Sequence, residues 1–160
     1  VLMAMVECPA VFLVVMGSPA SANDHGIAFY QALASTLGVA QRTYMTQEFV
    51  ADEDIAAIFR ASDVVLLLYA ESFVSQSGVL NIAARLRRPV LASSGNGPLR
   101  EAVERYNLGI FVPPRSLPDI VRGMSVLGSS DWNTGRWQEY EEYASWITNA
   151  KRIIETLLER

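Results

Sequence analysis

Apolar runs of strand length recur five times along this chain, and each gap between them is long enough to hold a helix. Parallel strands need crossovers of about a dozen residues or more, and these crossovers are usually helical. The alternation therefore predicts an α/β fold with a doubly wound parallel sheet and helices on both faces. The five runs cover residues 11–16, 42–46, 64–69, 90–92 and 109–112.

Two of the intervening helices carry boundary signals. Asp52, Glu53 and Asp54 place negative charge in the first turn of a helix that should end near Arg60, as the helix dipole favours. Pro98 directly follows a glycine. Because proline suits the first position of a helix, another helix is expected to begin there.

The chain changes character after residue 112, where two prolines end the last apolar run. We expect one helix over about 117–127, a polar turn over 128–131, and terminal helices over about 131–160. The tail carries apolar residues at three- and four-residue spacing, which predicts an amphipathic helix, bent near Trp146, that packs across the domain or bridges to a partner domain. These residues are Trp137, Tyr140 and Ala144.

The first seventeen residues are mostly apolar but lack the pattern of a signal peptide or a membrane span. Glu7 and Pro9 interrupt them, and no basic segment precedes them. We interpret them as a helix, a turn and a strand. Val1, Leu2 and Met5 lie on one face of this helix, so its apolar pattern is already under way at the first residue. We therefore expect a further segment upstream in the parent protein.

Composition narrows the class of protein. The chain has 160 residues, which suits one domain, and its 51% hydrophobic and 19% charged residues exclude a disordered chain. The net charge is −4, and the basic residues are scattered apart from Arg85, Arg87 and Arg88, which suit the end of a helix. Nucleic acid is therefore not an expected partner.

Single residues limit the available chemistry. Cys8 is the only cysteine, so no internal disulfide can form, which fits a reducing cytoplasm. His25 is the only histidine and lies in a polar loop, where a turn residue is more usual than a catalytic base. No metal-ligand spacing and no Ser–His–Asp set can be assembled from the sequence.

Residues 75–84, SQSGVLNIAA, follow the third apolar run and form a predicted anion-binding turn. Small polar residues and a glycine before a helix leave backbone N–H groups free, and the helix dipole favours an anion there. The alternative is an ordinary turn capped by Ser77. The connection over residues 70–78 exceeds the usual two to six residues, and its length favours a functional loop.

Two other glycine-containing turns should lie at the same edge of the sheet. Gly17 follows the first apolar run, and the segment 93–97 follows the fourth. Because ligands bind beyond the carboxyl ends of parallel strands, the three turns together predict a cleft. Glu71 could accept hydrogen bonds from sugar hydroxyls there or be a solvated loop residue, and Glu101 suits the positive end of its helix without any ligand.

Residues 62–114, SDVVLLLYAESFVSQSGVLNIAARLRRPVLASSGNGPLREAVERYNLGIFVPP, resemble the C-terminal, donor-binding domain of the family 4 (group 1) retaining glycosyltransferases. These enzymes have two facing Rossmann-like domains, the GT-B architecture. The likeness extends from about residue 11, where VFLVVMGSP resembles the family's strand and glycine turn, to 112. The tail 132–160 is similar to the family's terminal helices, which cross back to the N-terminal domain. The resemblance implies a single Rossmann-like domain over 1–160.

The resemblance also implies a substrate, a nucleoside-diphosphate sugar, with no cofactor and no metal. Its diphosphate would rest on the amides of residues 77–79, and its base would lie near residues 44–49. The parent protein would be a hexosyltransferase of polysaccharide biosynthesis, cytoplasmic or peripheral to the inner membrane face, with its own N-terminal domain as partner. The donor-binding residues would be Gly17, Tyr69, Glu71, Ser75, Gln76, Ser77, Gly78, Val79, Gly97 and Glu101, and the base region Tyr44, Thr46 and Phe49.

The chain departs from the family pattern in two respects. Many members carry two glutamates eight positions apart around the turn, and those positions hold Val74 and Ile82 here. The family's first strand, its acceptor-binding domain and its catalytic histidine are absent from this chain. We therefore expect the isolated domain to be inactive, because one wall of a cleft cannot both hold the leaving diphosphate and position the acceptor.

Three other functions remain open at this point. A nucleotide-sugar epimerase of the same fold would need acid and base groups in its cleft, of which the chain offers few. A non-catalytic module of the receiver type would need acidic residues after its first strand, where Gly17 stands instead. A degenerate glycosyltransferase kept as a scaffold would fit the apolar residues at positions 74 and 82.

Overall fold

A computed structural model describes residues 1–19, 24–129, 132 and 134–158 of the chain. Five strands form at the five positions predicted from the apolar runs, and every strand pair is parallel. The predicted α/β fold class is therefore confirmed. The strands are β1 (Leu13–Met16), β2 (Thr43–Thr46), β3 (Val65–Leu68), β4 (Val90–Ser93) and β5 (Gly109–Phe111).

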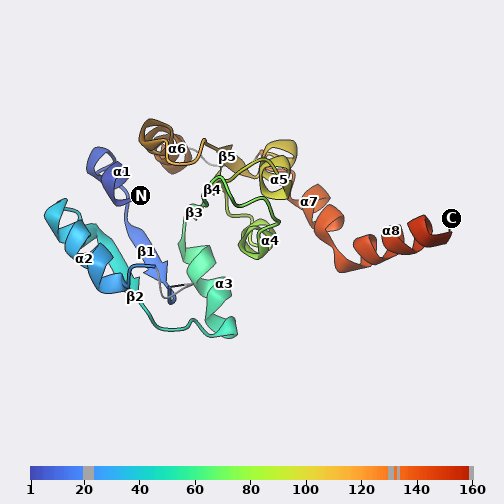
Figure 1. The fold of residues 1–160 in the computed structure, drawn as a ribbon, viewed down its shortest axis with the longest axis horizontal. Coiled ribbons are helices and arrows are strands. Elements are labelled where there is room, and N and C mark those ends of the chain that lie inside the picture. Colours follow the sequence, from blue (N-terminus) through green and yellow to red (C-terminus); the bar gives the residue numbers. More distant parts are fainter. Residues whose placement is uncertain (20–23, 130–131, 133, 159–160) are drawn as a thin grey trace.

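The strands form two hydrogen-bonded ladders (Figure 1). β1 pairs with β2, with Leu13 opposite Thr43. β4 lies between β3 and β5, with Leu91 opposite Leu66 on one side and Ile110 on the other. β1 and β3 do not pair with each other, so each presents an unpaired edge, a division that the apolar runs did not reveal.

Helices separate successive strands, as expected. α3 begins at Asp52 with its three acidic residues in the first turn, and α5 begins at Pro98. Asn107 ends α5 with a left-handed φ of 52°, a conformation that asparagine tolerates better than most residues. The helices are α1 (Leu2–Glu7), α2 (Ile27–Thr36), α3 (Asp52–Ala61), α4 (Gly78–Arg85), α5 (Pro98–Tyr106), α6 (Leu117–Ser129), α7 (Trp137–Ala144) and α8 (Trp146–Leu158), with a 3₁₀ turn over Ala40–Arg42.

β4 is buried on both faces, and its alternating side chains enter different parts of the core. Val90 and Ala92 pack with residues of α4, α5 and α7. Leu91 packs on the opposite side with residues of α6 and with Ala4 of α1. This two-faced burial explains why the strand is continuously apolar rather than alternating.

The N-terminal segment folds as the predicted helix, turn and strand. Arg42 fixes the turn, because its guanidinium donates hydrogen bonds to the backbone oxygens of Met5 (2.8 Å), Cys8 (3.0 Å) and Val11 (2.8 Å). Of these three, the Met5 carbonyl belongs to the last turn of α1, where helical acceptors are left without intrahelical partners. In the described part of the chain, no helix is both long and apolar enough to cross a membrane.

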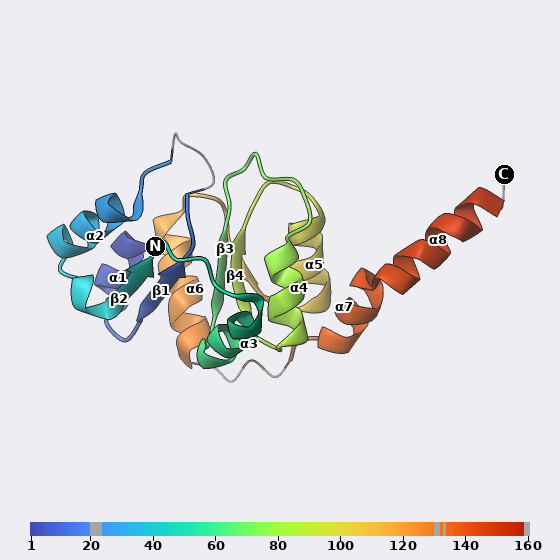
Figure 2. The ribbon, with the colours of Figure 1, turned by 90° about the horizontal axis from the view of Figure 1, so that it is seen from below.

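The terminal segment forms two helices that differ in their packing. α7 packs on α4 and α5, with Trp137 and Tyr140 in the core, which confirms the prediction of an amphipathic helix against the domain. Ser145, with extended backbone, separates α7 from α8 and gives the expected bend. α8 projects away from the rest of the chain, and Trp146 at its start is 91% exposed (Figures 1 and 2). Residues 130 and 131 of the predicted polar turn lie outside the described residues.

Candidate functional site

The predicted anion-binding turn lies at the N-terminal end of α4. Ser77 is the N-cap residue, and its Oγ accepts a hydrogen bond of 3.4 Å from the backbone N–H of Leu80. The same Oγ lies 3.2 Å from the hydroxyl of Tyr69, at the end of β3. Ser77 is only 2% exposed, so its side chain serves as a cap inside the protein.

Gly78 and Val79 form the exposed part of this turn. They occupy the first two positions of α4, where backbone N–H groups lack intrahelical acceptors. Within the described residues, no protein group accepts a hydrogen bond from either amide. A Cβ at position 78 would meet nothing within 4 Å, so the space before the turn is open. Two amides and the positive end of the helix dipole are therefore available to an anion.

The long loop between β3 and α4 folds against the turn after β4. Gly95 donates a backbone hydrogen bond of 3.0 Å to Phe73, and Phe73 stacks on Tyr69 with ring centroids 4.1 Å apart. A Cβ on Gly97 would lie 2.8 Å from the backbone oxygen of Val74. Gly97 therefore lets these two segments pack closely, and its predicted role in donor binding stays a prediction.

Three predicted turns leave the strands at the same edge, as Figure 2 shows for the segments after β1, β3 and β4. The structure brings the segments 70–77 and 93–97 into contact. Gly17 instead bonds to the end of β2, where its N–H donates to Thr46 at 3.1 Å, and its φ of 123° suits glycine alone. A cleft that all three turns share therefore stays a prediction.

Several predicted donor-binding residues are exposed. Glu71, Ser75 and Gln76 lie in the loop before Ser77, and Glu101 lies in the first turn of α5. Val74, one of the positions where the family carries glutamate, is 57% exposed and presents an apolar surface in the same loop. Glu71 is the carboxylate that this loop itself contains.

The predicted base region lies on the other ladder. Tyr44 and Thr46 belong to β2, and Phe49 follows it in the connection to α3. Phe49 is 90% exposed and Tyr44 is half exposed, so both rings are accessible for stacking. The structure shows no contact between these described residues and the α4 turn, and their role stays a prediction.

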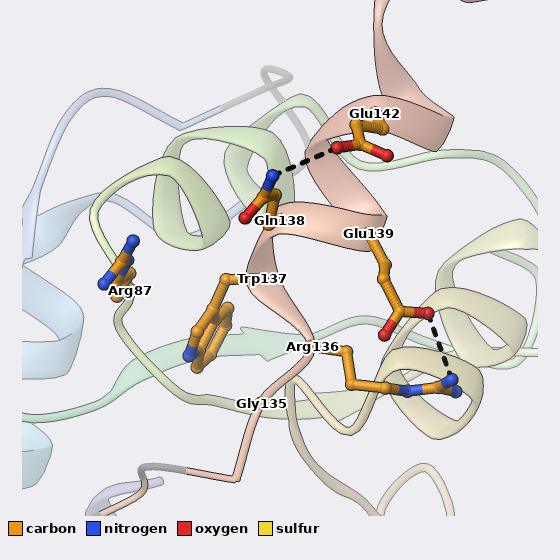
Figure 3. Close-up of a pocket in the computed structure, with 7 residues that line it drawn as sticks. All are labelled: Arg87, Gly135, Arg136, Trp137, Gln138, Glu139 and Glu142. Carbon is orange, nitrogen blue, oxygen red and sulfur yellow. Dashed lines mark hydrogen bonds and ion pairs between the residues drawn. The ribbon is translucent and has the colours of Figure 1, made fainter.

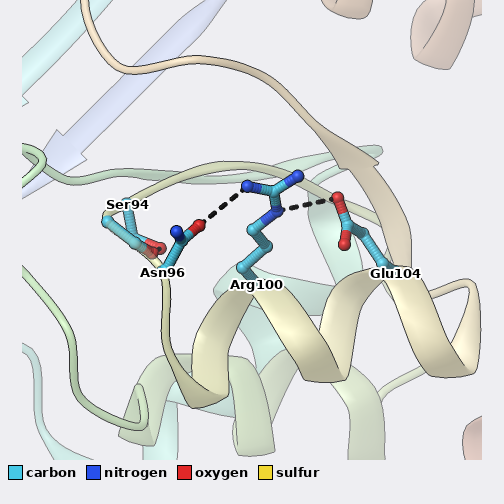
Figure 4. Close-up of polar contacts among 5 residues, drawn as sticks. Ser94, Asn96, Arg100 and Glu104 are labelled. Atoms are coloured by element: carbon cyan, nitrogen blue, oxygen red, sulfur yellow. Dashed lines mark hydrogen bonds and ion pairs between the residues drawn. The ribbon is translucent and has the colours of Figure 1, made fainter.

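Arg100 is a charged group near the site that the sequence did not single out (Figure 4). From α5, its guanidinium donates hydrogen bonds to Asn96 (2.9 Å) in the preceding turn and to Glu104 (3.0 Å) along the helix. It also lies over the ring of Phe111. The spacing of four residues on either side was visible in the sequence, but it is common on exposed helices.

Tyr140 of α7 is a second residue that sequence reasoning missed at this site. Its hydroxyl accepts a hydrogen bond of 2.6 Å from Gln76 Nε2 and donates one of 2.6 Å to Asn81 Oδ1. Burial raises the pKa of Tyr140 to about 12. Its three-residue spacing from Trp137 indicated a buried face, but nothing in that spacing indicated polar partners.

One hollow lies beside the residues that follow α4, at the opposite end of that helix from this turn (Figure 3). It measures about 460 Å³ and lies between the start of α7 and the residue Arg87 that follows α4. Its polar side chains pair with one another, since Arg136 bonds Glu139 and Gln138 bonds Glu142, each at 3.2 Å. These internal pairs leave it without an evident role in donor binding.

His25 has an aromatic environment. Its ring stacks on Phe29 with centroids 4.0 Å apart and meets Tyr30 edge-on. This contact just before α2 agrees with the interpretation of His25 as a turn residue. Among the described residues, no group of three or more His, Cys, Asp or Glu side chains could hold a metal ion.

Comparison with known proteins gives the fold. No protein-family model and no curated protein matches the chain. Solved structures that are similar include sucrose-phosphate synthase from Thermosynechococcus elongatus (TM-score 0.76, 18% identity) and Anabaena HepE in complex with UDP (0.79, 20%). A third is WaaG, a glycosyltransferase involved in lipopolysaccharide biosynthesis (0.67, 19%).

These matches cover nearly all of this chain but less than half of each similar protein. They span 99%, 99% and 89% of the chain, and 40%, 44% and 37% of the synthase, HepE and WaaG, respectively. HepE has also been solved in complex with UDP and glucose, again with a TM-score of 0.79. The chain therefore has the fold of a part of these proteins.

Proposed function

We propose that this domain binds the nucleoside-diphosphate portion of a sugar donor at the start of α4, as the donor-binding part of a glycosyltransferase. The observation that carries the proposal is the pair of open amides at Gly78 and Val79, at the end of a long strand-to-helix loop. It is supported by the similarity in fold to WaaG, a glycosyltransferase, and to HepE, which was solved with UDP.

Each part of the donor has a candidate partner in this chain. Diphosphate oxygens accept hydrogen bonds from the two amides, and the missing side chain of Gly78 lets them approach closely. Sugar hydroxyls reach Glu71 and the polar loop residues Ser75 and Gln76. The accessible ring of Phe49 would contact the base.

The parent enzyme is proposed to be a family 4 retaining hexosyltransferase with the GT-B architecture. A second domain would then bind the acceptor and complete the stabilisation of the leaving diphosphate. The isolated domain would bind the donor without transferring sugar. Polysaccharide biosynthesis, a cytoplasmic location and contact with the inner membrane face belong to this proposal and depend on the parent protein.

The divided sheet supports a further part of the same proposal. β1 and β3 point the same way, and each has an unpaired edge. One additional parallel strand between them would pair with both edges and join the two ladders. We propose that the family's first strand takes this place in the parent protein.

Titration of the isotope-labelled chain with UDP and with GDP tests the donor site. We expect the amide signals of Gly78 and Val79 to shift on addition of one or both nucleotides. Inorganic phosphate serves as a control for simple anion binding. Unchanged signals at these two residues would contradict the proposal and favour the scaffold function that Val74 suggests.

A further inference from the structure

The hydroxyl of Tyr140 joins α7 to both sides of the α4 N-terminus. Gln76, the residue before the N-cap Ser77, donates to it, and Asn81, in the first turn of α4, accepts from it. Both distances are 2.6 Å. The residues between these two contacts include Gly78 and Val79, so one buried oxygen spans the turn that carries the open amides.

Tyr140 is well suited to hold this position. The residue is 1% exposed, and its ring packs edge-on against Tyr106 at 5.5 Å between centroids. A tyrosine hydroxyl is protonated at neutral pH, so it can donate one hydrogen bond while it accepts another. The hydroxyl does both here: it accepts a hydrogen bond from Gln76 and donates one to Asn81.

A second tyrosine fixes the same turn from the strand side. The Tyr69 hydroxyl lies 3.2 Å from Ser77 Oγ, and Ser93 Oγ donates 2.8 Å to the backbone oxygen of Tyr69. Tyr69 thus connects the N-cap to β3 and β4. Tyr140 connects the flanking residues to α7, so the turn is held from two directions.

We propose that Tyr140 is a positioning residue for nucleoside-diphosphate binding, fixing Gln76 and Asn81 so that the Gly78 and Val79 amides present one preformed arrangement to the diphosphate. The inference rests on the proposed function of this turn. Preformed donors bind an anion more tightly than mobile ones, because less conformational freedom is lost on binding. The terminal helix α7 is then part of the donor site although it contacts no donor atom.

Tyr140→Phe tests the proposal, because it removes the hydroxyl and keeps the ring. Tyr106→Phe is the matched control, since it removes a hydroxyl from the neighbouring ring, which contacts neither Gln76 nor Asn81. Two quantities are measured in the full chain: hydrogen exchange of the Leu80 amide, which bonds Ser77 Oγ, and the UDP dissociation constant. We expect Tyr140→Phe to speed the exchange and to weaken UDP binding about three- to tenfold.

A double variant separates positioning from general stability. Gln76→Ala with Asn81→Ala removes both partners from exposed positions, so it should fold even if Tyr140→Phe does not. It should reproduce the loss of UDP affinity, and adding Tyr140→Phe to it should cause no further loss. Equal affinities in the wild type, the double variant and Tyr106→Phe would overturn the proposal.

The two readouts also separate this inference from the proposed function. If the wild-type chain binds neither UDP nor GDP, the proposed function fails, and the donor role of Tyr140 fails with it; if it binds GDP alone, the affinities of the variants are measured with GDP. The hydrogen-exchange rate of the Leu80 amide tests, without any ligand, whether the hydrogen bonds of Tyr140 to Gln76 and Asn81 hold the turn in place. Unchanged exchange in Tyr140→Phe, with UDP binding intact in the wild type, would overturn the positioning role alone.

Discussion

Gly123 of α6 lies directly against the side chain of Leu91 in β4. A Cβ at position 123 would overlap Leu91 Cδ1, which is confined because Leu91 is fully buried. The glycine therefore lets α6 approach the sheet closely. This contact helps to cover one face of the β3–β4–β5 ladder.

Gly123→Ala should destabilise the fold. Overpacking a buried contact usually costs about 1–3 kcal/mol, which exceeds the gain of about 0.5–1 kcal/mol from replacing glycine in a helix. Gly128→Ala is the control, because it lies in the same helix and its Cβ would meet nothing within 4 Å. Chemical denaturation measures both free energies of unfolding. Equal or greater stability of Gly123→Ala would contradict the close packing.

Gly78→Val should abolish most nucleotide binding while leaving the fold intact. The position is open, so the new side chain fits without a clash but covers the space before the amides. We expect UDP affinity to fall about tenfold or more, since a displaced diphosphate loses charge-assisted hydrogen bonds. Calorimetry measures the affinity, with Gly128→Val as the control. Undiminished binding in Gly78→Val would place the nucleotide elsewhere.

Arg42→Met should destabilise the N-terminal segment. It leaves the backbone oxygens of Met5, Cys8 and Val11 without their charged donor, and we expect a loss of about 2–3 kcal/mol. The control is Arg122→Met, whose side chain is 74% exposed and pairs with Asp119 across one helical turn. That variant should change stability by at most about 0.5 kcal/mol. Similar losses in both variants would refute a special role for Arg42.

The stabilising contribution of Tyr140 should decrease in alkaline solution. Its pKa rises from 10.0 in the unfolded chain to about 12 in the folded chain, so the contribution is complete below pH 10 and is lost as the pH approaches 12. The difference in unfolding free energy between the wild type and Tyr140→Phe should shrink by about 1 kcal/mol from pH 9 to pH 11. A constant difference over this range would show that the hydroxyl is not buried as described.

The strands could be predicted from the sequence because each lies in a short apolar run, and for β4 this signal follows from burial on both faces. β4, with Val90, Leu91 and Ala92 all fully buried, is the clearest case. The division into two ladders could not be predicted in this way. Apolar runs predict a strand, but they carry no information on which of its edges is paired or on whether it is fully covered: Val14 and Val15 of β1 are 45% and 40% exposed.

The location of the candidate site followed from loop length and residue type, whereas the roles of its residues depended on tertiary contacts. Ser75 and Ser77 are chemically alike, and only the neighbouring Tyr69 and the N-cap geometry make Ser77 a buried cap. The packing of Gly97 against Val74 depends on the folded loop and could not be predicted from the turn sequence. The partners of Tyr140 lie 59 and 64 residues away along the chain, beyond any local pattern.

The division of the sheet has a consequence for how the molecule loses its structure. In the described residues, the β1–β2 ladder is joined to the β3–β4–β5 ladder by side-chain packing, in which Leu66 takes part, and by contacts between α1 and α6, but by no strand-to-strand hydrogen bond. A boundary of this kind permits one part to open while the other stays closed. We expect the β1–β2 ladder to open first, whereas the turn at Gly78 belongs to the unit built on β3, β4 and β5.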